Sequence, residues 1–148
     1  MRVGRAGDTL VTHVLGSCLG LAVYDPVVRV GGLLHAMLPQ SAINPEKAQA
    51  NPSMFVDTGV PSLLDAVYRL GGNGERLLVK AAGCARPLGS GEMFKIGERN
   101  CTILRLVLWR AEILLDAEDI GGTASRTVHL DLATGRVRVT AGERERDL

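Results

Sequence analysis

A cysteine that directly follows a Gly-Ser pair is the residue in this sequence best suited to chemistry. The segment runs Leu15-Gly16-Ser17-Cys18. Because glycine has no Cβ, Gly16 lets the chain bend sharply beside a strand and approach a ligand. The backbone N–H groups of Ser17 and Cys18 in such a bend would hold a developing oxyanion. We therefore expect Cys18 to act as a nucleophile, with Gly16 and Ser17 as backbone support.

A thiol reacts as the thiolate, so Cys18 needs a base close by. His35 lies in the next apolar run, across the Asp25-Pro26 turn. Neighbouring strands lie about 4.8 Å apart, so a matching register would bring its imidazole to the thiol. A third group usually orients the imidazole, and Thr12 could do so with its hydroxyl or carbonyl oxygen. The pattern predicts nucleophilic attack with acid–base assistance.

Structural roles for the same residue types stay open at this point. A cysteine in an apolar strand is most often a small buried hydrophobe, and this holds for Cys18 too. His13 is a rival partner for the thiol, although a regular strand would send the two side chains to opposite faces. His129 is interpreted as structural. Cys84 and Cys101 lack the ligand spacing of a zinc site, so no metal site is predicted.

The elements that would position these residues predict an α+β domain with about seven strands and two main helices. Apolar runs over 9–24 and 27–38 predict neighbouring strands. A helix is predicted to begin near Asp57 or Thr58, and a second one at Asn100, each capped by that residue. The remaining predictions are a loop over 40–53, a glycine loop over 83–97, strands over 76–82 and 113–117, a hairpin of 127–132 with 136–140, and a solvated charged tail over 142–148.

The composition excludes several classes of protein. The 148 residues, 46% hydrophobic and 22% charged, fit a single globular domain over 1–148. With 17 basic and 16 acidic residues, the chain lacks the charge expected of a nucleic-acid binder or of a protein held on anionic lipid. No apolar run is long enough for membrane insertion. Three cysteines without a CxxC motif suit a reducing compartment, so we expect a cytoplasmic protein.

Several motifs together resemble a known family. The most specific are Leu15-Gly16-Ser17-Cys18, His35-Ala36-Met37-Leu38-Pro39 and Ile96-Gly97-Glu98-Arg99-Asn100. Tyr24-Asp25-Pro26 and Asp119-Ile120-Gly121-Gly122 add to them, in order and over nearly the whole chain. This combination resembles the CheD family, the chemoreceptor glutamine deamidases of bacterial and archaeal chemotaxis.

The resemblance implies a cysteine hydrolase that converts receptor glutamines to glutamates and releases ammonia through a thioester. It implies Cys18 as the nucleophile, His35 as the base and Thr12 as the group that orients the histidine, with no cofactor and no metal. The implied fold is that of the toxin deamidases, with β-sheets packed centrally as a sandwich and helices outside. The implied partners are the cytoplasmic helices of chemoreceptors and a CheC-type phosphatase.

Two segments depart from the family pattern. Gly83-Cys84-Ala85 stands where the family has Gly-Gly-Ala, with Met93-Phe94 following only later, and Ser125-Arg126 stands in place of Gly-Arg. Neither segment contains the three predicted catalytic residues. An alternative is therefore a CheD-like interaction module that binds chemoreceptors or the phosphatase with little or no turnover. Thiol reactivity discriminates between the two, because an activated Cys18 would alkylate faster than the other cysteines.

Overall fold

The computed structural model describes residues 1–86 and 95–148, in which strands and helices follow one another in an α+β order. The strands are β1 (Arg2–Arg5), β2 (Thr9–Leu15), β3 (Leu19–Asp25), β4 (Val30–Ala36), β5 (Leu78–Gly83), β6 (Ala117–Ile120), β7 (Arg126–Asp131), β8 (Val137–Ala141) and β9 (Arg144–Asp147). The helices are α1 (Pro45–Ala50), α2 (Val56–Arg69) and α3 (Ile96–Arg110), with short 3-10 turns at Ser41–Ile43, Pro52–Met54 and Gly74–Arg76.

Strand β3 lies at the centre of the larger of two sheets, whose strand order is β1-β4-β3-β5-β6. It pairs antiparallel with β4 and β5, and β6 joins parallel to β5. All seven residues of β3 are buried, because both of its faces are covered. Leu19 and Leu21 face the helices, whereas Ala22 and Tyr24 face the second sheet.

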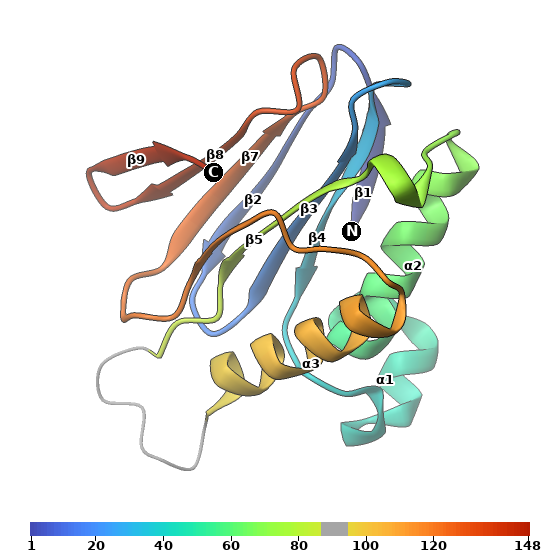
Figure 1. Ribbon diagram of the computed structural model, residues 1–148. Helices are drawn as coiled ribbons and strands as arrows, with labels where there is room; N and C mark the ends of the chain where they lie inside the picture. Colours follow the sequence, from blue (N-terminus) through green and yellow to red (C-terminus); the bar gives the residue numbers. More distant parts are fainter. Residues whose placement is uncertain (87–94) are drawn as a thin grey trace.

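The second sheet, of order β2-β7-β8-β9, covers one face of the larger sheet, and the helices cover the other (Figure 1). One core forms between the sheets, from residues such as Leu15, Leu130 and Val139. The other forms under α2 and α3, where Leu63 and Leu104 are almost fully buried. The predicted α+β sandwich with outer helices is confirmed, and the described helices all lie on the same side of it.

The apolar run over 9–24 is two strands rather than one. Its first half is β2 of the smaller sheet and its second half is β3 of the larger sheet. The pairing of β2 with β7 shifts register between Thr12 and Leu15, and Val14 has a left-handed φ of 56°. The chain then bends over 16–18 and crosses from one sheet to the other. The residues singled out for chemistry therefore lie at the junction of the two sheets.

The helices differ from the sequence predictions in three places. The predicted loop over 40–53 contains α1, whose first turn is capped by Asn44 through Lys47 N–H. Helix α2 starts at Val56, and Asp57 accepts hydrogen bonds from Ser41 instead of capping it. Helix α3 starts four residues before Asn100, which is consequently buried inside the helix and is not its cap.

The strands differ mainly at the edges of the sheets. Strand β1 was not predicted, and the strand expected over 113–117 lies over Ala117–Ile120. The tail over 142–148 is exposed as expected, yet it includes edge strand β9, paired with β8. Ion pairs such as Arg136–Asp147 hold this strand, whose mixed charges hide its pairing from the sequence. The hairpin of β7 and β8 is confirmed. The predicted glycine loop lies partly outside the described residues, and its last residues begin α3.

Candidate active site at the junction of the two sheets

The bend between β2 and β3 is held by its carbonyl groups. Gly16 O accepts a hydrogen bond from Ala85 N–H at 2.8 Å, just after β5. Ser17 O accepts one from Asn100 Nδ2 of α3 at 2.9 Å. Two segments distant in sequence therefore fix consecutive peptide groups of the bend.

The carbonyl of Cys18 is fixed in the same way, by the N–H of Cys84 at 2.8 Å. The chain must pass very close to this oxygen at Gly83, where a Cβ would lie 2.3 Å from Cys18 O. Gly83 also has a left-handed φ of 100°, which glycine adopts without strain. The end of β5 is thus shaped to receive the main chain of the candidate nucleophile.

These carbonyl bonds determine where the amide groups of the bend point. In a trans peptide the C=O and the following N–H point in opposite directions. Because Gly16 O is bonded to Ala85 and Ser17 O to Asn100, the N–H of Ser17 points away from Ala85 and the N–H of Cys18 points away from Asn100. Within residues 1–86 and 95–148, neither N–H donates a backbone hydrogen bond. Among the described residues the Ser17 N–H has no backbone acceptor, and the Cys18 N–H interacts with its own thiol, so these two amides are the candidate donors for an anionic oxygen.

His35 and Thr12 meet across the two sheets. The hydroxyl of Thr12 on β2 and Nδ1 of His35 on β4 are 2.9 Å apart, within hydrogen-bond distance. In the tautomer in which Nδ1–H donates to Thr12 Oγ1, the lone pair of Nε2 is free to accept a proton. The two side chains also line a pocket of about 140 Å³ that Cys18 does not line.

Cys18 lies on the same face of the larger sheet as His35. Gly20 of β3 is paired with His35 of β4, and Cys18 comes two residues before Gly20. Side chains two residues apart on a strand share a face, so Cys18 and His35 are diagonal neighbours, with Cα atoms about 7–8 Å apart by strand geometry. Cys18 accordingly packs against the core between the sheets, the core on His35's side of β4. Leu15 fills the space over Gly20, where a Cβ would lie only 2.5 Å from it.

Burial sets the protonation of both groups. It raises the pKa of the Cys18 thiol, with partial opposition from the residue's own backbone N–H. Burial lowers the pKa of His35, and the positive amino terminus adds to this shift. Each shift favours the neutral form. At neutral pH the free protein therefore holds a thiol beside a neutral imidazole, and the proton must move to His35 as the sulfur attacks.

The other candidate residues lie in different surroundings. His13 is exposed in the irregular part of β2, and His129 is half-buried in β7, where it pairs with Val11 and Arg138. Among the described residues, no group of three or more His, Cys, Asp or Glu side chains could hold a metal ion. No described helix has the length and apolar character required to cross a membrane.

Asn100 is a residue of the site that the sequence did not predict in this role. Its side chain is fully buried, and Nδ2 donates to Ser17 O and also to Met37 O at 3.3 Å. Met37 follows β4, two residues after His35. Asn100 therefore ties the bend that carries Cys18 to the end of the strand that carries His35. The sequence analysis interpreted Asn100 as a helix cap, and the signal that could have revealed its role was its place at the end of the Ile96-Gly97-Glu98-Arg99-Asn100 motif.

The fold and this site define an α+β protein in which a thiol, an imidazole and a hydroxyl gather at the junction of two packed sheets. The model of the CheD family, described as CheD chemotactic sensory transduction, matches residues 37–141. This chain belongs to the CheD family.

Individual relatives extend the similarity to the rest of the chain. The probable chemoreceptor glutamine deamidase CheD of Solibacter usitatus (strain Ellin6076) is 46% identical over 148 residues, covering 99% of this chain and 88% of its own. The probable chemoreceptor glutamine deamidase CheD 1 of Syntrophus aciditrophicus (strain SB) is 47% identical over 135 residues, 91% of this chain and 84% of its own. The probable chemoreceptor glutamine deamidase CheD of the archaeon Pyrococcus horikoshii is 43% identical over 139 residues, which cover 93% of this chain and 85% of its own.

Proposed function

We propose that this protein is a chemoreceptor glutamine deamidase, which hydrolyses receptor glutamine side chains to glutamate and ammonia. The observation that carries the proposal is the Thr12–His35 hydrogen bond of 2.9 Å on the sheet face shared by Cys18. A binding surface would not require a thiol beside an imidazole held in one orientation. The relatives named as deamidases are similar over nearly the whole chain, which supports the same reaction here.

Cys18 is the nucleophile of the first half-reaction. Its thiol passes a proton to Nε2 of His35 while sulfur bonds to the carboxamide carbon of the glutamine. The C=O electron pair moves onto oxygen and gives a tetrahedral oxyanion. The imidazolium then protonates the nitrogen and the C–N bond breaks. Ammonia departs, and the acyl group remains bound to Cys18 as a thioester.

Water completes the reaction. Neutral His35 takes a proton from a water molecule, whose oxygen attacks the thioester carbon. The second tetrahedral intermediate collapses, the C–S bond breaks and the sulfur regains a proton from the imidazolium. The products are a glutamate side chain and the starting form of the enzyme. Thr12 keeps Nδ1 engaged throughout, so Nε2 stays directed at the reacting atoms.

The amides of Ser17 and Cys18 stabilise both oxyanions. Their direction follows from the bonds of the Gly16 and Ser17 carbonyls to Ala85 and Asn100. Donors fixed before the substrate arrives cost no reorganisation during the reaction, which is why such sites contribute strongly to rate. Asn100 therefore supports catalysis through Ser17, as a positioning residue.

The proposed substrates are glutamines of chemoreceptors, as the names of the relatives indicate, and the resemblance in the sequence motifs points to those on the cytoplasmic helices. A CheC-type phosphatase is proposed as a further partner, on the strength of the family resemblance in the sequence motifs. Neither step of the reaction requires a metal or an organic cofactor.

Mass spectrometry of a chemoreceptor cytoplasmic fragment, incubated with the protein or with its Cys18→Ala variant, tests the proposal. We expect a gain of about 1 Da at defined glutamines with the native protein and none with the variant. Circular dichroism and thermal unfolding of the variant serve as the control for folding. Deamidation by Cys18→Ala would remove this cysteine from the mechanism. A fragment that is bound by the native protein but not modified would favour the interaction module.

A further inference from the structure

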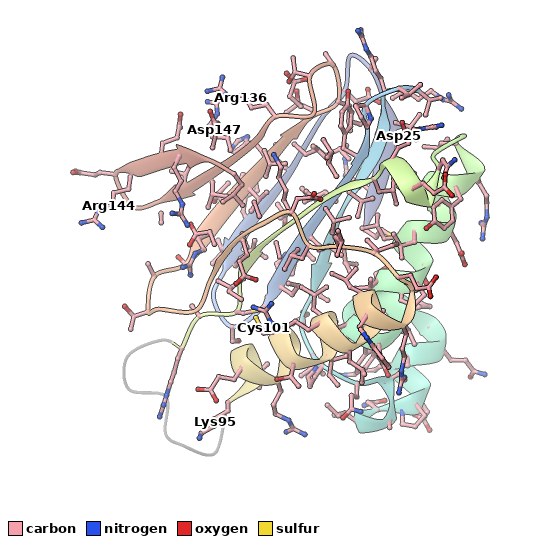
Figure 2. The ribbon with its side chains drawn as sticks, in the orientation of Figure 1. Asp25, Lys95, Cys101, Arg136, Arg144 and Asp147 are labelled. Carbon is pink, nitrogen blue, oxygen red and sulfur yellow. The ribbon has the colours of Figure 1, made fainter. Side chains whose placement is uncertain are left out.

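Two thiols besides Cys18 meet next to the nucleophile bend. Cys84 directly follows β5, is 4% exposed, and donates its N–H to Cys18 O. Cys101 belongs to α3 and is half-buried against the same helix-covered core as Cys84. Figure 2 shows Cys101 on the side of α3 that faces the strands. The sequence separation of the two cysteines conceals this proximity.

The packing of α3 explains why they meet. Gly97 lies one helical turn before Cys101, and a Cβ on it would lie 2.4 Å from Cys84 O. The first turn of α3 therefore rests directly on the main chain of Cys84. Helical side chains lean toward the N-terminus, over the residue four positions earlier. The thiol of Cys101 thus leans toward Gly97, where Cys84 lies, and the opposite pKa shifts of the two thiols are those of a hydrogen-bonded pair.

The two thiols are unequal in reactivity. The hydrogen bond from Cys84 lowers the pKa of Cys101, and the guanidinium of Arg105 lowers it further, although burial opposes both. The same hydrogen bond and burial raise the pKa of Cys84. Cys101 is also the more exposed of the two. It is therefore the thiol that ionises and meets an oxidant first.

The backbone of Cys84 is a second unusual feature. Its φ of 52° lies in the left-handed region, which costs a residue with a Cβ free energy that glycine would not lose. A cysteine here sets its thiol against α3, whereas a glycine would relieve the strain and bring no thiol.

We propose that Cys84 and Cys101 form a reversible disulfide, an oxidation site beside the active site that responds to peroxides. The Cys101 thiolate attacks a peroxide oxygen, which breaks the O–O bond and gives a sulfenic acid and, for hydrogen peroxide, one water. Cys84 attacks the sulfenic sulfur, the S–S bond forms and a second water leaves. Two thiols lose two electrons and two protons, and hydrogen peroxide is reduced to two waters. A dithiol reverses the reaction by exchange.

The disulfide acts on the nucleophile through the main chain. Its sulfurs must approach to about 2.05 Å, which draws Cys84 toward α3. Cys84 N–H holds the carbonyl of Cys18, and Asn100, the neighbour of Cys101, holds that of Ser17. Both supports of the bend therefore move together when the bond forms. We expect oxidation to draw the Cys18 thiol further into the core and to slow its reactions.

Peptide mapping tests the site without relying on the proposed function. The full chain with Cys18→Ala is treated with hydrogen peroxide, remaining thiols are alkylated, and the protein is digested without reductant. We expect an intact-mass loss of about 2 Da and a cross-linked peptide pair containing Cys84 and Cys101, both reversed by dithiothreitol. Cys18→Ala combined with Cys101→Ser is the matched control and forms no cross-link. Cys18→Ala combined with Cys84→Gly, in which glycine suits the left-handed backbone, is the reciprocal control and also forms no cross-link.

Two outcomes of this experiment overturn the proposal. One is separate oxidation of the two thiols to sulfinic acids without any cross-linked peptide. The other, in the native chain, is a cross-link that pairs Cys84 with Cys18 in preference to Cys101.

The coupling to the site has its own measurement. The native chain is oxidised, freed of peroxide, and the iodoacetamide rate at Cys18 is followed by mass for molecules that carry the disulfide and a reduced Cys18. We expect alkylation several-fold slower than in the reduced protein, and no such change in Cys101→Ser under the same treatment. Equal rates in the oxidised and reduced protein would overturn the coupling.

Discussion

The two ends of β3 use their polar groups in opposite ways. At its last residue the Asp25 carboxylate is fully buried and accepts hydrogen bonds from the backbone of Val27, Val28 and Asn73 and from the guanidinium of Arg76, at 2.7 Å for the closest. Burial alone would raise its pKa, but these bonds outweigh it and lower the pKa to about 2. Both oxygens of the Asp25 carboxylate therefore accept hydrogen bonds from groups of the protein itself.

At the other end the protein binds the carbonyls of the bend, and in the proposed reaction the Cys18 thiol and the amides of Ser17 and Cys18 act on a substrate. Cys18 and His35 are half-buried, and burial favours the neutral form of each. A buried charge with a full set of partners stabilises one structure, whereas a half-buried neutral group that one hydrogen bond orients, as Thr12 orients His35, keeps its capacity for chemistry. We call the buried Asp25 carboxylate, with its hydrogen-bonded partners, the anchor; it lies at one end of β3, and the candidate active site lies at the other.

Removing the base is expected to have the largest effect. His35→Ala should lower the deamidation rate by about 10²–10⁴-fold, because general acid–base help to the thiol and the leaving ammonia is lost. The rate of conversion of a receptor fragment measures it. His13→Ala is the matched control, since His13 is exposed on the irregular part of β2, and should keep a rate near that of the native protein. A strong loss in His13→Ala with little in His35→Ala would reverse their roles.

Removing the anchor should act on stability instead. Asp25→Ala leaves Arg76 and several N–H groups without their buried partner; breaking a fully buried ion pair costs about 3–5 kcal/mol, and because the Arg76 side chain is 36% exposed we expect a loss near the lower end of that range. Urea unfolding measures the loss. Glu118→Ala removes an exposed pair with Arg105 and should cost less than about 1 kcal/mol. Equal small losses in both variants would contradict the role of Asp25 as an anchor.

The anchor also has a pH signature. Because its folded pKa of about 2 is below the ordinary value of 3.8, the Asp25 carboxylate stabilises the fold fully above that ordinary value. This contribution disappears as the pH falls through about 2. Urea unfolding of the native protein and of Asp25→Asn between pH 6 and pH 2 should show the difference in stability shrinking toward acid. A difference that stays constant would show that the carboxylate charge contributes nothing.

Loosening the bend should have an intermediate effect. Asn100→Ala removes the donor to Ser17 O, in a half-buried residue, and to Met37 O, in an exposed one; a buried acceptor left without a partner costs about 1–3 kcal/mol, so we expect a loss of stability toward the lower end of that range. Thr102→Ala, on the exposed side of the same helix, is the control. If both variants unfold at the same urea concentration as the native protein, the buried asparagine does not hold the bend.

Freeing the imidazole should have the smallest effect on rate. Thr12→Val keeps the shape of the side chain and removes the hydroxyl bonded to His35. The deamidation rate should fall about tenfold, which corresponds to the free energy of one hydrogen bond.

The deamidation rate of the native protein should rise with pH through a midpoint below 6.5, because burial lowers the pKa of His35 and the neutral imidazole is the active form. A midpoint above 6.5 would contradict the buried neutral base.

The sequence by itself determined the chemistry-bearing residues and the class of the fold. Gly16, Ser17 and Cys18 form the expected bend, because a glycine at the end of an apolar run permits one whatever the surroundings. The β3–β4 hairpin and the β7–β8 hairpin were predicted from turn residues between apolar runs, which act locally. The roles of Cys18, His35 and Thr12 in catalysis stay predictions until the deamidation experiment is done.

Only the tertiary structure decided what lies around those residues. The run over 9–24 has the same strand pattern on both sides of the bend, and nothing local says that its halves enter different sheets. Asn100 looks like a helix cap because asparagine is a common cap residue. The residues that it binds, Ser17 and Met37, are distant in sequence, so local patterns do not reveal them. Cys84 and Cys101 look unrelated for the same reason. Periodicity and turn chemistry depend on neighbouring residues, whereas burial and the meeting of distant side chains are set by how the sheets and helices pack.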